Sequence, residues 1–374
     1  MTNYGRRTIL RGIGASAIAA TALRSLPVFA QDRKTVRIGY AISKTGANAA
    51  GAGITTTPNY VLWVKDVNDA GGIKLSKLGV QLPIEVIEYD DRSSAEETVR
   101  AIERLATQDQ VDFILPTWGT GPNLASGPSF DKFGYPQLAA TAVTDMAPQV
   151  AQRWKKSFWM LGGGHDYANA LVQLLVKQRD AGKINNKVAI ISVADGFGID
   201  LSKAATPAFQ AAGFELVYDK SYPLGTSDFA PLLNEIAGLG ADTFAAFSYP
   251  PDTFAITQQA VVASFNPKVF YLGVGTAFPV YPKVAGPNHN NVMGIGGIDP
   301  DSPEIEAYFK RHTELIGEAP DSWASAVTYS SLQILHQAIE RVGDLDRDAV
   351  SSEIATGEFD TILGKLKLKD NQLR

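Results

Sequence analysis

Two short apolar runs that end in small or hydroxyl-bearing residues constrain this fold most. Residues 111–115 lead into Pro-Thr-Trp-Gly-Thr-Gly at 116–121, and residues 136–140 lead into Thr141. A short apolar run bounded by Gly and Pro is typical of a buried parallel strand. Pro122 and Asn123 then favour the start of a helix. We therefore expect two strand ends side by side, at the carboxyl edge where doubly wound sheets bind ligands.

This edge has the donors for an anion site. The backbone N–H groups of 119–121, the hydroxyls of Thr120 and Thr141 and the start of a helix can all face one negative group. The alternative interpretation is a pair of ordinary tight turns between strand and helix. Trp118 would suit a ring by stacking, or would only fill space.

Composition excludes several classes of protein. The 374 residues exceed one ordinary core, so two domains are expected. The net charge of −5 argues against a nucleic-acid binder. The absence of cysteine excludes disulfides, thiolate metal sites and a catalytic thiol.

Residues 1–30 are predicted to be a signal peptide. Gly-Arg-Arg-Thr-Ile-Leu-Arg at 5–11 resembles a twin-arginine export motif. The weakly apolar residues 12–23 are too short to span a bilayer, and 28–30 (Val-Phe-Ala) offer cleavage positions. We expect export to the periplasm with cleavage near Ala30. The alternative is a disordered basic N-terminus.

The remaining chain reads as two series of strand and helix units, which predicts an α/β fold with parallel sheets and helices on both faces. Strands are expected at 35–41, 82–88 and 111–115, and the pattern restarts after Trp154. The glycines at 162–164 are interpreted as a crossing between two lobes or as a plain surface loop.

Several segments in this order resemble the branched-chain amino-acid (Leu/Ile/Val) binding family of type I periplasmic solute-binding proteins of ABC importers. The resemblance covers about residues 36–370. The matching segments are 45–46 (Thr-Gly), 68–73 (Asn-Asp-Ala-Gly-Gly-Ile), 89–91 (Tyr-Asp-Asp), 139–141 (Ala-Ala-Thr), 225–229 (Gly-Thr-Ser-Asp-Phe) and 329–339.

The resemblance implies two doubly wound parallel-sheet lobes joined by a three-crossing hinge that closes on a ligand. We expect the first lobe at 31–160, with a return segment at about 292–345. The second lobe is expected at 161–291, with the C-terminal segment at about 346–374.

The resemblance also implies a binding site. Trp118, Gly119 and Thr120, together with the segment Ala139, Ala140 and Thr141, match the positions that hold the ligand carboxylate. Phe197 and Tyr249 match the second-lobe aromatic positions that close over the ligand. Asn48, in the loop after the first strand, completes the first-lobe candidates.

One departure bears on the ligand. The acidic residue that pairs with a ligand ammonium in the family falls at about Gly275, where no carboxylate stands. Asp195 or Asp252 is a candidate substitute, although both also suit plain helix caps. Otherwise the ligand has no amino group, as in an aromatic or aliphatic carboxylate or an amide, because a buried unpaired ammonium is costly.

No catalytic or metal motif is present, so we expect a binder without a cofactor rather than an enzyme. The four histidines show no metal spacing. Asp90 and Asp91 are neighbours on a strand, so their side chains point to opposite faces. The expected partners are a small solute and an inner-membrane ABC permease, with the protein a monomer. A sensory module for a signalling partner is the second functional hypothesis.

Overall fold

The computed structural model describes residues 33–373. The predicted signal peptide and its cleavage near Ala30 lie outside these residues. Within residues 33–373, no helix is long and apolar enough to cross a membrane.

The first lobe is built on parallel strands. The central β1 (Val36–Ile42) pairs in parallel with β4 (Ile84–Asp90) and β5 (Phe113–Leu115). Nearby, β6 (Gln137–Ala139) pairs in parallel with β7 (Ser157–Trp159). Almost every residue of β1 is buried, whereas much of the edge strand β4 is partly exposed. This difference is expected between a strand covered on both faces and one at a sheet edge.

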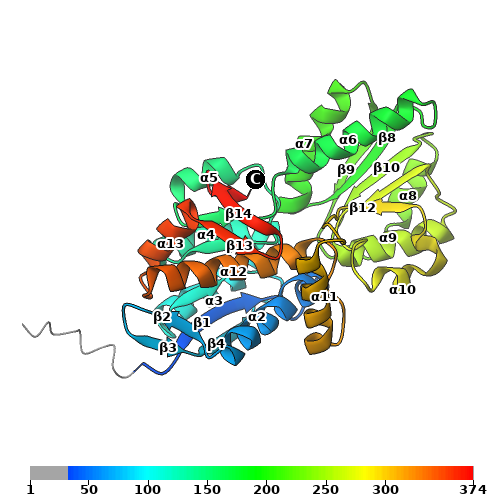
Figure 1. The fold of residues 1–374 in the computed structure, drawn as a ribbon. Helices are drawn as coiled ribbons and strands as arrows, with labels where there is room; N and C mark the ends of the chain where they lie inside the picture. The colour runs from blue at the N-terminus through cyan, green and yellow to red at the C-terminus, as the bar shows by residue number, and fades with distance from the viewer. Residues whose placement is uncertain (1–32, 374) are drawn as a thin grey trace, which may run out of the picture. The chain divides into compact units, whose positions relative to one another are not determined.

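Helices flank these strands, and a separate two-stranded hairpin completes the lobe (Figure 1). The hairpin is β2 (Ile73–Leu75) with β3 (Val80–Leu82). The helices of the first lobe are α1 (Ala49–Thr55), α2 (Thr57–Asp69), α3 (Ala95–Thr107), α4 (Thr120–Phe133), α5 (Ala147–Arg153), α11 (Pro303–Ile316), α12 (Ala324–Val342) and α13 (Arg347–Thr356).

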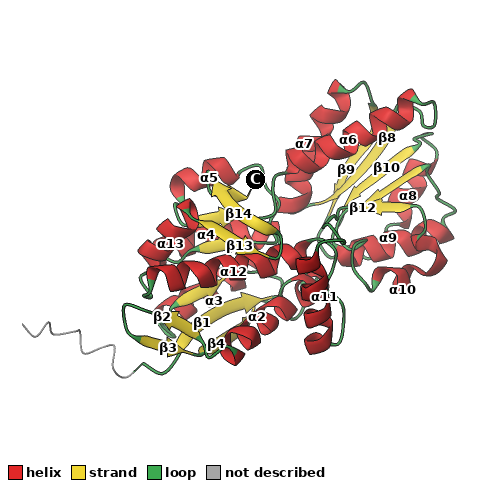
Figure 2. Ribbon diagram, viewed as in Figure 1, coloured by secondary structure: helices red, strands yellow, loops and turns green. Residues whose placement is uncertain are grey.

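The second lobe has a five-stranded parallel sheet in the order β12-β11-β10-β8-β9. Figure 2 shows α6 and α7 over one face of this sheet and α8 and α9 over the other. The strands are β8 (Lys187–Val193), β9 (Glu215–Tyr222), β10 (Thr243–Phe247), β11 (Val269–Leu272) and β12 (Val292–Gly294). The helices are α6 (Gly164–Asp180), α7 (Gly196–Ala211), α8 (Ala230–Ala237), α9 (Pro250–Val262), α10 (Tyr281–Ala285) and the short 3₁₀ helix η2 (Gly286–His289).

The expected start of the return segment is wrong. Residues 292–294 form β12, which pairs in parallel with β11 and therefore stays in the second lobe. The helices α10 and η2 fill the chain between the two strands, so β12 continues the series of strand and helix units. The return to the first lobe follows β12, because α11 and α12 both pack against α2.

The expected place of the C-terminal segment is also wrong. Strands β13 (Glu358–Thr361) and β14 (Gly364–Lys369) form an antiparallel hairpin. An unpredicted strand, β15 (Gln372–Leu373), pairs with β14 and, in parallel, with β7 of the first lobe. Within residues 33–373 the chain passes between the lobes after β7 and after β12.

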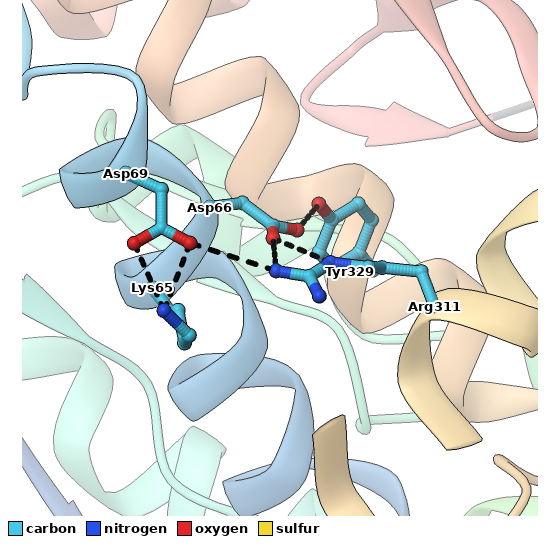
Figure 3. A network of polar contacts seen from close by, with 5 residues as sticks. All are labelled: Lys65, Asp66, Asp69, Arg311 and Tyr329. Atoms are coloured by element: carbon cyan, nitrogen blue, oxygen red, sulfur yellow. Dashed lines mark hydrogen bonds and ion pairs between the residues drawn. The ribbon is translucent and has the colours of Figure 1, made fainter. Parts of the chain in front are cut away.

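A polar network fixes the returning helices on the first lobe (Figure 3). The Asp66 carboxylate on α2 accepts hydrogen bonds from Arg311 Nε at 3.0 Å and Nη2 at 2.8 Å. It also accepts one from the Tyr329 hydroxyl at 2.8 Å. Arg311 lies on α11 and Tyr329 on α12, so one carboxylate ties both helices to α2.

Candidate functional site

The two predicted strand ends meet. The Gly119 backbone N–H donates to Thr141 Oγ1 at 3.2 Å, and the Thr141 hydroxyl donates to the Thr117 carbonyl at 3.4 Å. Gly119 has a φ of +93°, a conformation that favours glycine, and it precedes the first turn of α4. The loop therefore turns sharply into the helix with its backbone beside Thr141.

The Thr120 hydroxyl is hydrogen-bonded to the Val143 backbone within the first lobe. Its Oγ1 donates to the Val143 carbonyl at 3.3 Å and accepts from the Val143 N–H at 3.0 Å. The expectation that this hydroxyl faces an anion is therefore wrong, because both of its hydrogen-bonding roles are used within the first lobe. The backbone N–H groups at the start of α4 remain the donors of this helix end.

The buried carboxylate of Asp91, which was not among the predicted site residues, anchors the loop at Thr117. Asp91 is only 1% exposed and accepts hydrogen bonds from the hydroxyls of Thr117 at 2.6 Å and Ser43 at 2.6 Å. It also accepts from Thr98 Oγ1 at 3.2 Å. Asp90, by contrast, accepts hydrogen bonds from the Lys44 N–H and the Thr45 hydroxyl in an exposed loop. The two neighbouring acids thus lie in separate surroundings, as the alternation along a strand predicts.

Trp118 is held in a defined position. Its indole Nε1 donates to Thr55 Oγ1 at 2.9 Å, and its side chain is 3% exposed. A Cβ built on Gly51 would lie 2.1 Å from the Trp118 ring, so glycine is required there for the ring to fit. Nearby, Ala139 and Ala140 are also buried.

Three aromatic rings meet between the lobes. Tyr249 stacks on Phe197 with ring centroids 5.2 Å apart and an interplanar angle of 17°. On the first lobe, Trp118 lies 4.9 Å from the Tyr249 ring at an angle of 55°. The structure therefore brings together three of the predicted site residues, two from the second lobe and one from the first.

Asp195 combines a cap with a position facing the first lobe. As the residue before α7, it accepts from the Phe197 N–H at 2.9 Å, which is the cap interpretation of its role. Its other oxygen accepts from the Tyr249 hydroxyl at 2.9 Å. The same oxygen would lie 3.2 Å from a Cβ built on Gly121 of α4. Burial raises the pKa of Asp195, opposed by the hydrogen bond from Tyr249.

Asp252 serves the interior of the second lobe. It accepts from the Tyr222 hydroxyl at 3.0 Å and from the Tyr249 backbone N–H at 3.1 Å. It is 2% exposed, and burial raises the pKa of its carboxyl to about 6. These contacts lie within the second lobe, so Asp195 is the better placed of the two candidate acids to face the first lobe.

Two further positions complete the predicted set. Asn48 is 1% exposed, its backbone N–H donates to Ser93 Oγ, and its Oδ1 has no hydrogen-bond partner among the described residues. Gly275 has a φ of +118° and faces the Pro250 backbone, 3.2 Å from where its Cβ would be. A side chain at 275 would be strained in this conformation.

The beginnings of two helices approach each other across the lobes. A Cβ built on Gly196, in the first turn of α7, would lie 3.1 Å from the Gly121 backbone nitrogen in the first turn of α4. Both helix ends carry partial positive charge, which a negative group between them would offset. Within residues 33–373 no group of three or more His, Asp or Glu side chains is placed to hold a metal ion.

A separate cavity of about 630 Å³ lies at the passages between the lobes. It is lined by residues such as Leu161, Trp323 and Leu363, and it includes none of the predicted site residues.

Comparison with known proteins agrees with this architecture. The family described as "Periplasmic binding protein" matches residues 35–374. A curated relative, Leu/Ile/Val-binding protein homolog 7 of Brucella suis biovar 1 (strain 1330), is 22% identical over 310 residues, which cover 79% of this chain and 75% of that protein.

Solved structures show the same fold. A leucine-binding protein from Thermotoga maritima MSB8 has a TM-score of 0.75 at 19% identity, with 90% of this chain and 92% of that chain covered. A solute-binding protein of an ABC transporter from R. palustris, solved in complex with benzoate, has a TM-score of 0.79 at 20% identity, with 91% of each chain covered. These likenesses confirm the predicted two-lobed α/β fold with parallel sheets. Because the family match spans almost the whole described chain, this protein belongs to the periplasmic binding protein family.

Proposed function

We propose that this protein is the periplasmic substrate-binding component of an ABC importer and binds a carboxylate-bearing solute between its lobes. It is exported, acts as a monomer, and delivers the solute to an inner-membrane permease. Solute binding favours the closed arrangement because the solute contacts both lobes at once.

The facing positions of Gly121 and Asp195 carry this proposal. The start of α4 offers backbone N–H groups and positive dipole charge to a carboxylate. Across from it, the Asp195 carboxylate approaches within 3.2 Å of the position of a Gly121 Cβ. An α-amino acid carries the complementary pair of charges, so its carboxylate would face α4 and its ammonium would face Asp195.

The magnitudes fit a nutrient receptor. A hydrogen bond to a charged group contributes roughly 1.5–3 kcal/mol. Several of them, less the cost of closing the lobes and ordering the solute, correspond to micromolar affinity, about −8 kcal/mol. Relatives named for leucine, isoleucine and valine support the amino-acid class.

An aromatic carboxylate without an amino group is the second candidate. Asp195 already accepts hydrogen bonds from Phe197 and Tyr249, which leaves it less capacity for an ammonium. The rings of Trp118, Phe197 and Tyr249 form an environment suited to a planar solute. A neighbour in fold binds benzoate, which supports this class.

Isothermal titration with leucine, isoleucine and benzoate tests the proposal. If an amino acid binds, Asp195→Asn should weaken binding at least tenfold, because the ammonium loses its anionic partner. If benzoate binds instead, the same variant should retain or improve binding. Asp228→Asn is the matched control, since Asp228 is an exposed acid whose carboxylate accepts from the Ala230 N–H and makes none of these contacts. Failure of every small carboxylate to bind would reject the proposed solute class.

A further inference from the structure

The Tyr249 hydroxyl lies where the proposed solute charges would lie. It donates to Asp195 Oδ2 at 2.9 Å, which is the role proposed for a solute ammonium. The hydroxyl oxygen would also lie 3.5 Å from a Cβ built on Gly119.

This one side chain therefore joins the lobes. Tyr249 and Asp195 belong to the second lobe, whereas Gly119 and Thr120 begin α4 of the first. The ring adds to the junction, since it packs between Phe197 of its own lobe and Trp118 of the other. Tyr249 is 2% exposed, so these contacts are shielded from water and are stronger than they would be at the surface.

We propose that Tyr249 is an internal occupant of the solute site, whose phenol engages Asp195 beside the start of α4 and must be displaced before a solute ammonium can bind there. This inference rests on the proposed function for the location of the site and adds a competitor built into the chain. The hydroxyl, which donates to Asp195, stands in for the ammonium of an amino acid.

The consequence is a lowered apparent affinity. When the binding-competent state is only a fraction of the population, the apparent dissociation constant rises by the inverse of that fraction. The solute must replace the hydrogen bond from the phenol to Asp195, so a solute that bears an ammonium displaces the phenol better than one without a donor. Tyr249 thus favours ligands that can donate to Asp195.

The variant Tyr249→Phe distinguishes the role of the hydroxyl from that of the aromatic ring. The variant keeps the stacked ring but removes the bond to Asp195. We expect leucine to bind the variant about three- to tenfold more tightly than the wild type in isothermal titration. Without solute, small-angle X-ray scattering should give a larger radius of gyration for the variant, because its lobes have lost the hydroxyl that lies between Asp195 and the start of α4.

Tyr222→Phe is the matched control. Tyr222 is also a buried tyrosine that donates to a carboxylate, Asp252, but its ring packs on Phe229 of the second lobe rather than on Trp118 of the first. Loss of the Tyr222 hydroxyl should change neither the radius of gyration nor the affinity for leucine. If Tyr249→Phe weakens leucine binding, or matches Tyr222→Phe in both measurements, Tyr249 is not an internal occupant.

The scattering measurement also distinguishes failure of this inference from failure of the proposed solute class. If neither leucine nor benzoate binds the wild type or the variant, the solute class is wrong. A larger radius of gyration for unliganded Tyr249→Phe would then still support the link between the lobes. An unchanged radius would overturn it.

Discussion

Gly196 and Gly121 approach so closely across the two lobes that a Cβ on Gly196 would lie 3.1 Å from the Gly121 backbone nitrogen. Backbone cannot move aside as a flexible side chain can, so an added methyl group must hold the lobes apart. We predict that Gly196→Ala weakens solute binding by about 1–3 kcal/mol, the usual cost of overpacking. Isothermal titration measures the change.

Gly238→Ala is the control for this substitution. Gly238 is also in the second lobe, its φ is −81°, and a Cβ there would meet no atom within 4 Å. Equal affinities for Gly196→Ala and Gly238→Ala would show that the approach of α4 and α7 does not limit closure.

Thr141→Val tests the junction of the two strand ends. The substitution removes the oxygen that accepts from the Gly119 N–H and leaves that buried donor unpaired. We predict a loss of about 1–3 kcal/mol in solute binding. Thr141→Ser keeps the hydroxyl and should keep most of the affinity. Isothermal titration of both variants measures the contribution of the Thr141 hydroxyl to binding. Unchanged binding by Thr141→Val would remove Thr141 from the site.

Asp252 predicts a dependence of stability on pH. Burial raises the pKa of its carboxyl from 3.8 to about 6 in the folded state. The folded state therefore holds this proton more tightly than the unfolded state, so the stability that the group contributes is complete below pH 4. That contribution is lost as the pH rises through 6, by at most about 3 kcal/mol.

Urea unfolding of wild type and Asp252→Asn between pH 4 and pH 7 measures this effect. An asparagine has no carboxyl to ionise, so the variant should lose less stability than the wild type as the pH rises. Parallel curves for the two proteins would contradict the assignment to Asp252.

The Asp66 network predicts a contrast between two neighbouring ion pairs. Asp66→Asn removes the charge that holds Arg311 and Tyr329, and should reduce the free energy of unfolding by about 1–2 kcal/mol. Lys65→Ala breaks only the pair with Asp69, in which both side chains are about half exposed. Its cost should be below about 0.5 kcal/mol. Urea unfolding compares them, and equal losses would show that the Asp66 bonds add little.

The sequence predicted those features of the site that depend on neighbouring residues in the chain. The glycine at 119 and the hydroxyl at 141 indicated that two strand ends meet, and the Gly119–Thr141 hydrogen bond shows this meeting. The partners of short strands were not predictable, because β12 and β15 contain too few residues to specify a neighbour by alternation. As a result, β12 was assigned to the wrong lobe and β15 was not predicted.

Contacts between distant side chains were likewise outside the reach of the sequence. Asp195 and Asp252 appeared equivalent as acids that follow strands. Only the fold shows that Asp195 faces Gly121 whereas Asp252 is engaged by Tyr222. The hydrogen bond from Tyr249 to Asp195 joins positions 54 residues apart, and no periodicity signals such a pair.

The buried Asp91 has a consequence for the speed of solute exchange. By fixing Thr117 from behind, it holds the rim of the first lobe in one conformation before any solute arrives. A rim that is already ordered loses little entropy on capture, so arrival rates should differ little among solutes. Discrimination should then appear mainly in how long each solute stays.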